Sequence, residues 1–545
     1  MRIFSRKFDL LIRVVFVAGL MSFSVLLAAC GPVPNSESAI SLLNRGISGE
    51  PETLDPHRST SNQAVSVLRD IGEGLMSYKA DGTLELGVAH RWEESDDHLT
   101  LTFFLRPEAR WSDGSEVIAS DFVFSFQRLV DPRTAAPYAE FVSAIVNTVE
   151  IVRGDLGPDE LGVVAIDRLT LEIQLHTPTP HFLEMLAHPS TFPISQTAFL
   201  AIGERLFTPE NSVSNGAYIL DERVIGSSIT LSRNNLYWND ESTSIDRVNY
   251  HVVDQDMEYD RYRAGDLDIT ANVPESIFSL IRKERPSELR VAPYLGIYYY
   301  GFNLTKAPFA NNRKLRQALS MAIDRQVLVE KITGRGEIPA YTWVPPGVNM
   351  YGSEMSEFAS LEREDRVALA RQLFKEAGYN SGDELNFELR YNTSNGHRRI
   401  ALAIQGMWRD VLGIEAKLAN EEFAVFISSV RNKQDTQVFR LSWTGDYNDA
   451  LSFLQILKSD NPSNLTGYAN PAFDDVLALA EREADPIVRR FQLERAERLA
   501  MADFPVIPLY FYVSKHLIDN SIIGWEDNVM DVHLTKHLSI RSSRN

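Results

Sequence analysis

The sequence predicts an α/β fold, because strand and helix patterns alternate along the chain and no internal repeat is present. The clearest stretch is 385–446, where three strand patterns are separated by two helical patterns. Units of this kind wind into a parallel sheet and bind ligands beyond the carboxyl ends of their strands. With 545 residues, the chain is long enough for about two to four domains.

Side-chain periodicity predicts the individual elements in order. Strands are expected over 83–111, followed by a turn at 112–114. Two helices are expected where apolar residues recur at helical spacing, one after Asn312 and one that ends at Gly378. Within the clearest stretch, alternation predicts three strands and the spacing of apolar residues predicts two intervening helices: strands 385–391, 414–418 and 438–443, and helices around 400–407 and 423–430.

This arrangement places the loops 392–397 and 444–448 at the carboxyl ends of strands, so His397 and Asp446 are expected on one rim of the sheet. Asp446 lies beside Gly445 and aromatic residues, where its carboxylate can receive an ammonium group, although Asp near Gly most often forms a turn. His397 lies at a helix start, where backbone donors favour an anion, although a solvated helix terminus is the common case. The pair suits a zwitterion.

The only cysteine of the chain, Cys30, follows a basic start, an apolar run over 14–27 and the small residues Ala28 and Ala29. This pattern resembles a bacterial lipobox, so we expect a signal peptide over 1–29, lipidation at Cys30 and a tether over 30–43. An ordinary secretory signal with an incidental cysteine is the alternative. The mature chain is expected at the periplasmic or cell-surface side of a bacterial membrane, attached to it through lipid only.

Charge and composition exclude several functions. The net charge of −20 becomes −23 without residues 1–29, which carry four basic residues and Asp9, and this argues against nucleic acid. With Cys30 lipidated, no thiol remains for a disulfide or a metal, and the histidines at 176, 181 and 188 fit core or loop positions better than a metal site. We expect a protein with no cofactor, no metal and no enzymatic activity. We also expect it to be a monomer. An exported hydrolase that acts on peptides stays open.

Motifs that occur in order over 44–540 resemble those of bacterial oligopeptide-binding lipoproteins, the solute receptors of ABC importers in the peptide/nickel-binding family. They include Glu50-Pro51-Glu52-Thr53-Leu54-Asp55-Pro56-His57, Trp111-Ser112-Asp113-Gly114, Ser214-Asn215-Gly216-Ala217-Tyr218 and Ala322-Ile323-Asp324-Arg325. The resemblance implies a two-lobe periplasmic-binding-protein-like fold with three domains, which closes by a hinge over an extended ligand. The expected domains are I (44–72, 198–295 and 514–545), II (73–197, inserted) and III (296–513), with crossing strands near 294–297 and 512–515.

The resemblance also implies a function and binding residues. Short peptides are expected as ligands and the permease subunits of an ABC importer as partners, with murein tripeptide or another amino-bearing solute as the alternative. Asp446 would hold the ligand ammonium. The other expected binding residues are Thr60, Asn62, Tyr138, Tyr294, Tyr299, Asn392, His397, Phe423, Arg431, Arg440, Ser442, Trp443, Thr444 and Tyr512. Relatives carry a disulfide pair at the positions of Gly296 and Thr444, which this chain lacks.

Overall fold

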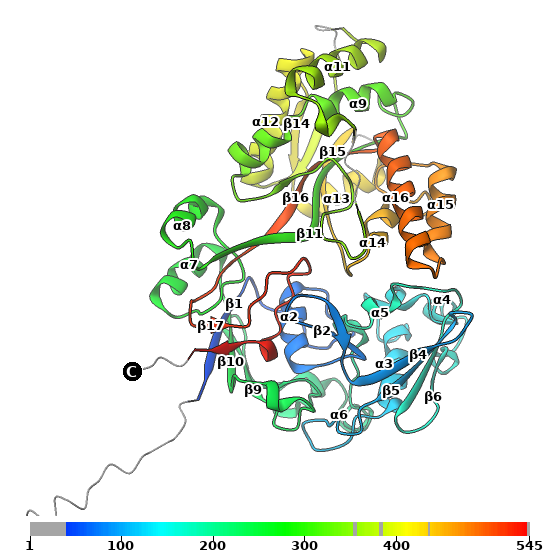
Figure 1. Cartoon of the computed structure of the whole chain (residues 1–545), viewed down its shortest axis with the longest axis vertical. Coiled ribbons are helices and arrows are strands. Elements are labelled where there is room, and N and C mark those ends of the chain that lie inside the picture. The colour runs from blue at the N-terminus through cyan, green and yellow to red at the C-terminus, as the bar shows by residue number, and fades with distance from the viewer. Residues whose placement is uncertain (1–39, 353–356, 381–384, 434–435, 542–545) are drawn as a thin grey trace, which may run out of the picture. The chain divides into compact units, whose positions relative to one another are not determined.

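The computed structural model describes residues 40–352, 357–380, 385–433 and 436–541 (Figure 1). The described residues from Leu42 onward belong to one compact unit. Cys30 and the expected signal peptide lie outside the described residues. The strands of the compact unit form three sheets of four to six strands and two sheets of two strands.

A four-stranded sheet joins the start of the described chain to its middle. Its order is β1 (Leu42–Ile47), β10 (Arg247–Val252), β9 (Ser228–Arg233) and β8 (Tyr218–Val224). β1 runs parallel to β10, and the other neighbours are antiparallel. α2 (Asn62–Ile71) covers this sheet because Ala64, Val67 and Leu68 on its inner face are buried in the same core as Leu43.

A second four-stranded sheet is entirely antiparallel. Its order is β4 (Ala89–Glu94), β5 (Thr100–Leu105), β7 (Thr170–Gln174) and β6 (Val163–Ala165), and α3 (Ala119–Val130) packs against it. β2 (Met76–Tyr78) and β3 (Leu84–Leu86) form a separate pair. The strands predicted over 83–111 are confirmed as β3, β4 and β5. Short helices complete this region: α4 (Thr148–Arg153), α5 (Phe182–Met185) and α6 (Gln196–Ile202).

The third sheet has six strands and contains the predicted strand–helix units. Its order is β12 (Ile338–Pro339), β16 (Val506–Leu517), β11 (Leu289–Phe302), β15 (Val438–Thr444), β13 (Glu388–Asn392) and β14 (Lys417–Glu421). β13 pairs in parallel with β14 and β15, so the parallel arrangement predicted for 385–446 is confirmed. β11 adds antiparallel pairs on its two sides, so the whole sheet is mixed.

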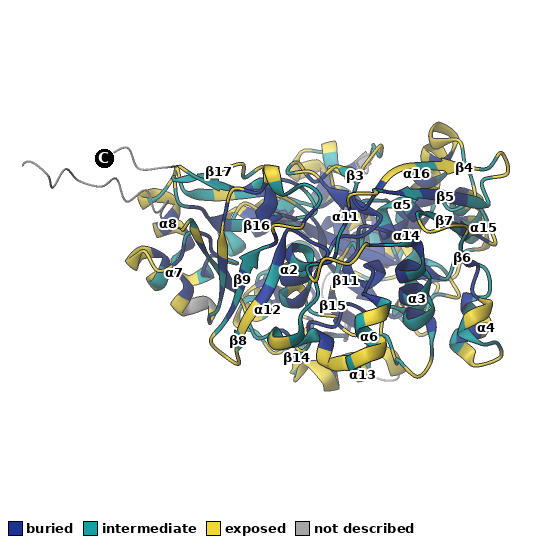
Figure 2. Ribbon diagram, turned by 90° about the horizontal axis from the view of Figure 1, so that it is seen from below, coloured by how far each residue is buried: buried dark blue, intermediate teal, exposed yellow. Residues whose placement is uncertain are grey.

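Helices cover both faces of this sheet, and β11 shows how. Tyr298 and Tyr300 belong to a core shared with α9 (Arg313–Met321), α11 (Arg363–Glu376) and α12 (Asn395–Leu412). Ile297 and Tyr299 point into another core, built with α13 (Phe423–Asn432), α14 (Leu451–Leu454), α15 (Pro471–Glu481) and α16 (Pro486–Asp503). Successive side chains of a strand face opposite sides, so both faces are apolar. Figure 2 shows β11, β15 and β16 largely in the colour of buried residues.

The predicted helix signals are confirmed at α9 and α11. The Asn312 side chain caps α9 by accepting from the backbone N–H of Leu315, and Gly378 follows α11 with φ 95°. The predicted starts of β13 and β14 are each three residues early. Leu385, Phe387, Ile414 and Ala416 are buried in the core although they precede these strands. The alternating apolar residues therefore mark where side chains become buried. In both strands this happens before the backbone begins to pair with a neighbouring strand.

β11 and β16 pair along most of their length, but their register breaks between Pro293 and Ile297, whose partners are Val513 and Phe511. This break coincides with the strand crossings that the resemblance placed near 294–297 and 512–515. Both strands extend across expected domain boundaries, at 295/296 and 513/514. The division into three domains itself stays a prediction.

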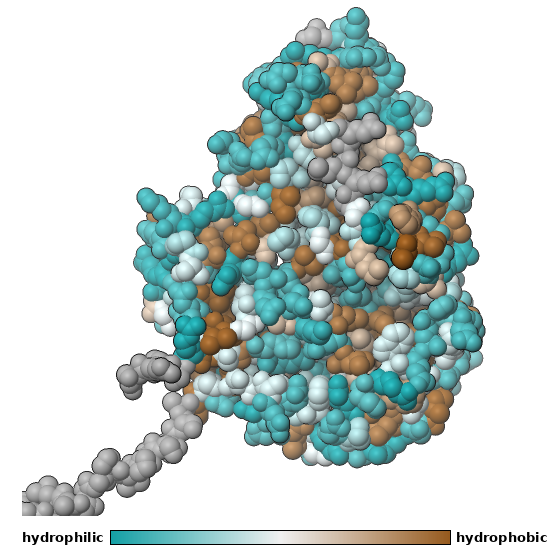
Figure 3. All heavy atoms as spheres, in the orientation of Figure 1, coloured by the Kyte–Doolittle hydropathy of each residue, from teal (hydrophilic) through white to brown (hydrophobic). Residues whose placement is uncertain are grey.

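The remaining elements are short or lie near the ends of β11 and β16. They are α7 (Gln255–Ala264), α8 (Phe278–Glu284), α10 (Arg325–Val327), β17 (Ile522–Ile523) and β18 (Ser539–Ile540). Among the described residues, no helix has the length and apolarity needed to cross a membrane. On the face drawn in Figure 3, hydrophobic residues are interspersed with hydrophilic ones.

Candidate ligand-binding site

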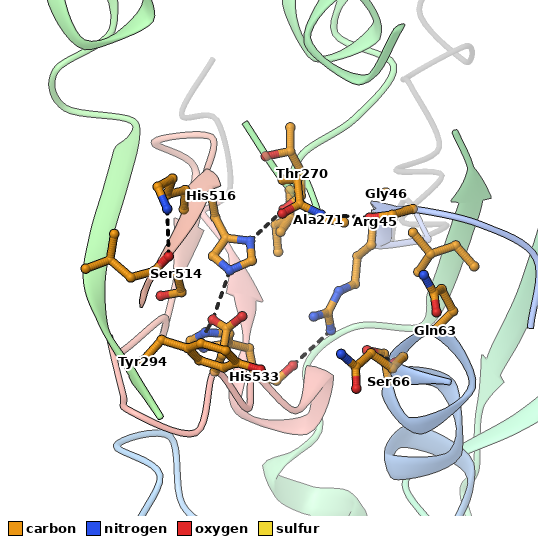
Figure 4. A pocket seen from close by; sticks show the side chains of 18 of the residues that line it. Arg45, Gly46, Gln63, Ser66, Thr270, Ala271, Tyr294, Ser514, His516 and His533 are labelled. Atoms are coloured by element: carbon orange, nitrogen blue, oxygen red, sulfur yellow. Dashed lines mark hydrogen bonds and ion pairs between the residues drawn. The ribbon is translucent and has the colours of Figure 1, made fainter. Parts of the chain in front are cut away.

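A cavity of about 520 Å³ lies beside the register break of β11 and β16. This volume is in the range of cavities that hold small ligands. Five of the predicted binding residues line it: Asn62, Tyr294, Ser442, Thr444 and Tyr512. The other walls come from β1, α2, the segment 269–272 and the chain after β16, as Figure 4 shows for several of their side chains.

β15 presents its end to this cavity. Its first four residues are buried in the sheet, whereas Ser442 and Thr444 are exposed. The cause is the register with β13: Leu389 pairs with Val438, so β13 ends level with Leu441 and β15 continues beyond it. Gly296 and Thr444 are direct partners across β11 and β15, in keeping with the paired positions that the resemblance assigned to them.

Arg440, on β15, is buried and makes only neutral hydrogen bonds. Its guanidinium donates to Asn392 Oδ1 at 3.2 Å, to the Tyr512 hydroxyl at 3.2 Å and to Ser442 Oγ at 3.4 Å. It also lies 4.5 Å from the centre of the Tyr298 ring. Within the described part of the chain, no carboxylate forms an ion pair with Arg440, and its Nε has no hydrogen-bond partner. A buried cation without a counter-ion is a strong attractor for a ligand anion.

His397 contributes to the same end of the site as a neutral group. Its Nδ1 lies 3.2 Å from the Tyr298 hydroxyl. Burial and the nearby charge of Arg440 lower the pKa of His397 to about 3. Its position is set by α12, which begins at Asn395 behind the capping residue Ser394. The anion preference expected of His397 therefore resides in Arg440, with His397 as a hydrogen-bonding neighbour.

Asp446 provides the opposite charge. Its backbone N–H donates to Ser452 Oγ at 3.2 Å, and the Trp443 indole donates to the backbone oxygen of Ser452 at 2.7 Å, so Ser452 anchors this loop. Burial raises the pKa of the Asp446 carboxyl to about 6. No ion pair involving Asp446 occurs among the residues that the structure describes. An ammonium group of a ligand would supply the missing counter-charge.

Tyr138 lies near enough to two carboxylates to feel their charges, and the sequence did not single out one of them, Glu52. Burial raises the pKa of the Tyr138 phenol, and the negative charges of Asp446 and Glu52 raise it further. Glu52 accepts hydrogen bonds from the backbone N–H of Thr60 at 2.5 Å and from that of Ser61 at 2.9 Å. Burial acts to raise the pKa of Glu52, but hydrogen bonds from Ser61 and Thr60 lower it to about 2. Glu52 belongs to the 50–57 motif, and no spacing pattern marked it as a site residue.

Ten of the fifteen predicted binding residues are not among those that line this cavity: Thr60, Tyr138, Tyr299, Asn392, His397, Phe423, Arg431, Arg440, Trp443 and Asp446. Tyr299 is buried in the core, with its ring centre 4.7 Å from that of Trp343. Phe423 and Arg431 are exposed on α13 and do not line the cavity. Tyr298, the neighbour of Tyr299, contacts Arg440 and His397 instead.

Arg440 and Asp446 do not line the cavity themselves, but they flank along the chain two residues that do, Ser442 and Thr444. An unpaired guanidinium and an unpaired carboxylate on either side of a cavity wall are typical of a protein that binds zwitterionic solutes. The family model of bacterial extracellular solute-binding proteins, family 5, matches residues 83–464, and the chain belongs to this family. It is therefore a binding protein that works outside the cytoplasm, and not an enzyme.

Two curated relatives cover nearly all of the chain. It is 39% identical to the periplasmic murein peptide-binding protein MppA of Escherichia coli (strain K12) over 489 residues, which is 89% of this chain and 90% of the relative. It is 36% identical to the periplasmic oligopeptide-binding protein OppA of Salmonella typhimurium (strain LT2) over 541 residues, 97% of this chain and 98% of that protein.

Solved structures agree with this assignment. The unliganded open form of MppA matches with a TM-score of 0.84 and 38% identity, covering 93% of this chain and 99% of that one. A second structure of the Escherichia coli protein matches with a TM-score of 0.77. The Haemophilus influenzae OppA complex with the peptide RPPGFSPFR matches with a TM-score of 0.75 and 33% identity, over 92% of this chain and 99% of that one.

Proposed function

We propose that this protein captures short peptides outside the cytoplasm and delivers them to the permease of an ABC importer. The observation that carries the proposal is a pair of opposite charges, the buried Arg440 and the half-buried Asp446, neither of which forms an ion pair with another described residue. An extended peptide with free ends has one charge of each sign at a separation set by its length. Asp446 lies six positions after Arg440, which limits the distance between their Cα atoms to about 20 Å, the length of a short extended peptide.

One feature of the cavity supports binding through the peptide backbone. Ser442 and Thr444 are exposed where β15 runs beyond β13, so this part of the strand has no partner on that side. An extended ligand can pair with such a strand through main-chain hydrogen bonds, which give affinity with little dependence on side chains. The family relation to OppA proteins, one of which was solved with a bound peptide, is consistent with this mode.

Murein tripeptide is the second candidate ligand. The relation to MppA favours it, with 39% identity and a TM-score of 0.84 to the open form. A diaminopimelate side chain carries an additional ammonium group, and Glu52 offers an additional carboxylate beside Tyr138. Glu52 would then discriminate murein tripeptide from ordinary tripeptides.

The function is tested by removing the charge of Asp446 while its shape is kept. In Asp446→Asn, the ligand ammonium would be buried without a counter-charge, which typically costs about 2–5 kcal/mol. Calorimetric titration with trialanine should show a loss of affinity of roughly 30-fold to several-thousand-fold. N-acetyl-trialanine, which lacks the cation, should bind the wild type weakly and lose much less on the same substitution.

The exposed Asp96 provides the matched control, since Asp96→Asn makes the same chemical change far from the cavity residues. It should bind both peptides as the wild type does. Equal losses for free and acetylated trialanine on Asp446→Asn would show that Asp446 does not hold the ammonium. If murein tripeptide binds and trialanine does not, the second candidate replaces the first.

We also propose that Cys30 is lipidated and anchors the mature protein to a membrane. The support is the sequence pattern before Cys30, with its basic start, apolar run and small residues. Each buried methylene of an acyl chain contributes about 0.8 kcal/mol, and two chains give stable attachment. Cys30→Ser should therefore release a protein that still binds peptide. Recovery of the wild type in the soluble fraction with a free thiol would contradict the proposal.

A further inference from the structure

On one wall of the cavity, two histidine side chains approach a single carboxylate oxygen of Asp531. Asp531 Oδ1 lies 2.9 Å from His516 Nε2 and 3.1 Å from His533 Nε2. The three atoms lie within 4.8 Å of one another. His516 belongs to β16 and the other two to the chain that follows, and all three line the cavity (Figure 4). The peptide site described above uses none of them.

The surroundings hold both imidazoles in position. His516 Nδ1 lies 2.8 Å from the backbone oxygen of Thr270. A carbonyl only accepts, so Nδ1 carries a proton. This is the arrangement in which metal-binding histidines are usually held. The Asp531 carboxylate also only accepts, so Nε2 donates to it in this structure and has to release its proton when it binds a metal. The His533 ring stacks on Trp525 with ring centres 3.5 Å apart, which fixes its plane.

Asp531 is also held in place by the backbone. It has φ 54°, in the left-handed region that non-glycine residues seldom adopt. The turn before it is closed by Asn528, whose side chain bonds to both the N–H and the carbonyl oxygen of Val532. An unfavourable conformation maintained in this way often marks a functional position.

The donor set selects a class of cation. Two imidazole nitrogens and one carboxylate suit Zn²⁺ and neighbouring transition metals, whereas Ca²⁺ and Mg²⁺ prefer oxygen ligands alone. Zinc–ligand distances of about 2.0–2.2 Å in a tetrahedral site place neighbouring ligand atoms about 3.3–3.6 Å apart. The observed separations of 2.9 Å and 3.1 Å therefore need to open by roughly 0.2–0.7 Å.

The nearby cations do not prevent this. Lys515 and Arg335 also line the cavity, but each pairs with Glu337, at 3.4 Å and 3.1 Å. Arg45 is closer and donates to the backbone oxygen of His533 at 3.0 Å, while its guanidinium lies 5.3 Å from the centre of the Tyr250 ring. Its positive charge opposes a bound cation, and the Asp531 carboxylate favours one.

We propose that His516, Asp531 and His533 form a three-ligand site for a transition-metal cation such as Zn²⁺. All three residues line the cavity, so the remaining coordination positions are reached from the cavity side, where water or a donor atom of a solute completes them. This site goes beyond peptide capture and does not depend on it. The competing explanation is an Asp531–His516 ion pair that only fastens the C-terminal chain to β16.

The experiment is calorimetric titration of the untagged full-length protein, stripped with a chelator and free of peptide, with ZnCl₂ alone. The wild type should bind one Zn²⁺ per chain. Asp531→Asn, which keeps the shape and tolerates the same backbone conformation, should weaken binding at least tenfold, and so should His533→Gln. His90→Gln, which changes an exposed histidine away from the cavity, should leave binding unchanged.

A second measurement keeps the test decisive if one variant folds poorly. Co²⁺ bound to the wild type should show the visible absorption of a low-symmetry site with nitrogen ligands, and His533→Gln should abolish it while its circular dichroism stays native. Absence of Zn²⁺ binding to the wild type, or equal binding by wild type and both cavity variants, would overturn the metal site. Either result leaves the peptide titrations unaffected, so the two proposals fail separately.

Discussion

At the scale of single residues, burial sets the charge state of the site. It raises the pKa of Asp446 to about 6 and, together with the charge of Arg440, lowers the pKa of His397 to about 3. Near pH 7 Asp446 is therefore ionised, His397 is neutral and Arg440 is charged. This combination matches a ligand with one free ammonium and one free carboxylate group.

Peptide affinity should accordingly depend on pH through Asp446. Burial disfavours its ionised form, so the unliganded protein loses stability from this group as the pH rises through about 6. A bound ammonium favours the ionised form and lowers the pKa, so binding below pH 6 releases a proton. Affinity for trialanine should be highest near pH 7 and fall by up to tenfold per pH unit below about 6. It should also fall toward pH 8, because the α-amino group of the peptide then loses its proton.

Calorimetry in buffers of different ionisation enthalpy would measure both the affinity and the released proton. Asp446→Asn should bind weakly and without this pH dependence. The variant therefore distinguishes Asp446 from other groups that titrate in this range, such as Glu184, whose pKa is raised to about 7 by burial. A pH dependence that persists in Asp446→Asn would assign the titration to another group.

At the scale of elements, the sequence predicted helices and strands whose positions follow from which side chains are buried. It missed the strand pairings that depend on segments far apart in the chain. Helix spacing and caps located α9 and α11, and alternation located β13, β14 and β15, because these patterns follow from which side chains face the core. The antiparallel addition of β11 and the offset between β13 and β15 depend on contacts between distant segments. No local pattern encodes them.

The same limit explains why the sequence selected the wrong tyrosine for the site and missed a cluster of three residues. The run Tyr298-Tyr299-Tyr300 predicted a buried strand, but alternate residues of a strand face opposite sides, and the pattern does not show which side is the cavity. Tyr298 therefore reaches Arg440, while Tyr299 packs against Trp343. The cluster of His516, Asp531 and His533 was missed because a turn brings its residues together, and none of their spacings is that of a metal motif.

At the scale of the whole molecule, the cavity draws its walls from parts that only a few strands connect. Arg45 and Asn62 belong to β1 and α2, whereas Ser442 and Thr444 belong to the six-stranded sheet. β11 and β16 run beside both groups, and their pairing is irregular at 294–296. Two structures of the same relative match this chain with TM-scores of 0.84 and 0.77, and the higher value belongs to the unliganded open form.

These observations lead us to predict that ligand closes the molecule around the cavity. A ligand that contacts both walls binds the closed state more tightly than the open one, so it shifts the equilibrium toward closure by its difference in affinity. A ninety-nine-fold excess of the open state would need roughly a 10⁴-fold preference to be inverted.

Small-angle scattering should show a smaller radius of gyration with saturating trialanine than without it. Asp446→Asn at the same peptide concentration should keep the larger radius, because it binds too weakly to be saturated. If the wild type binds trialanine by calorimetry and its radius stays constant, the ligand enters a cavity that is already formed, and the irregular pairing of β11 and β16 is not a hinge.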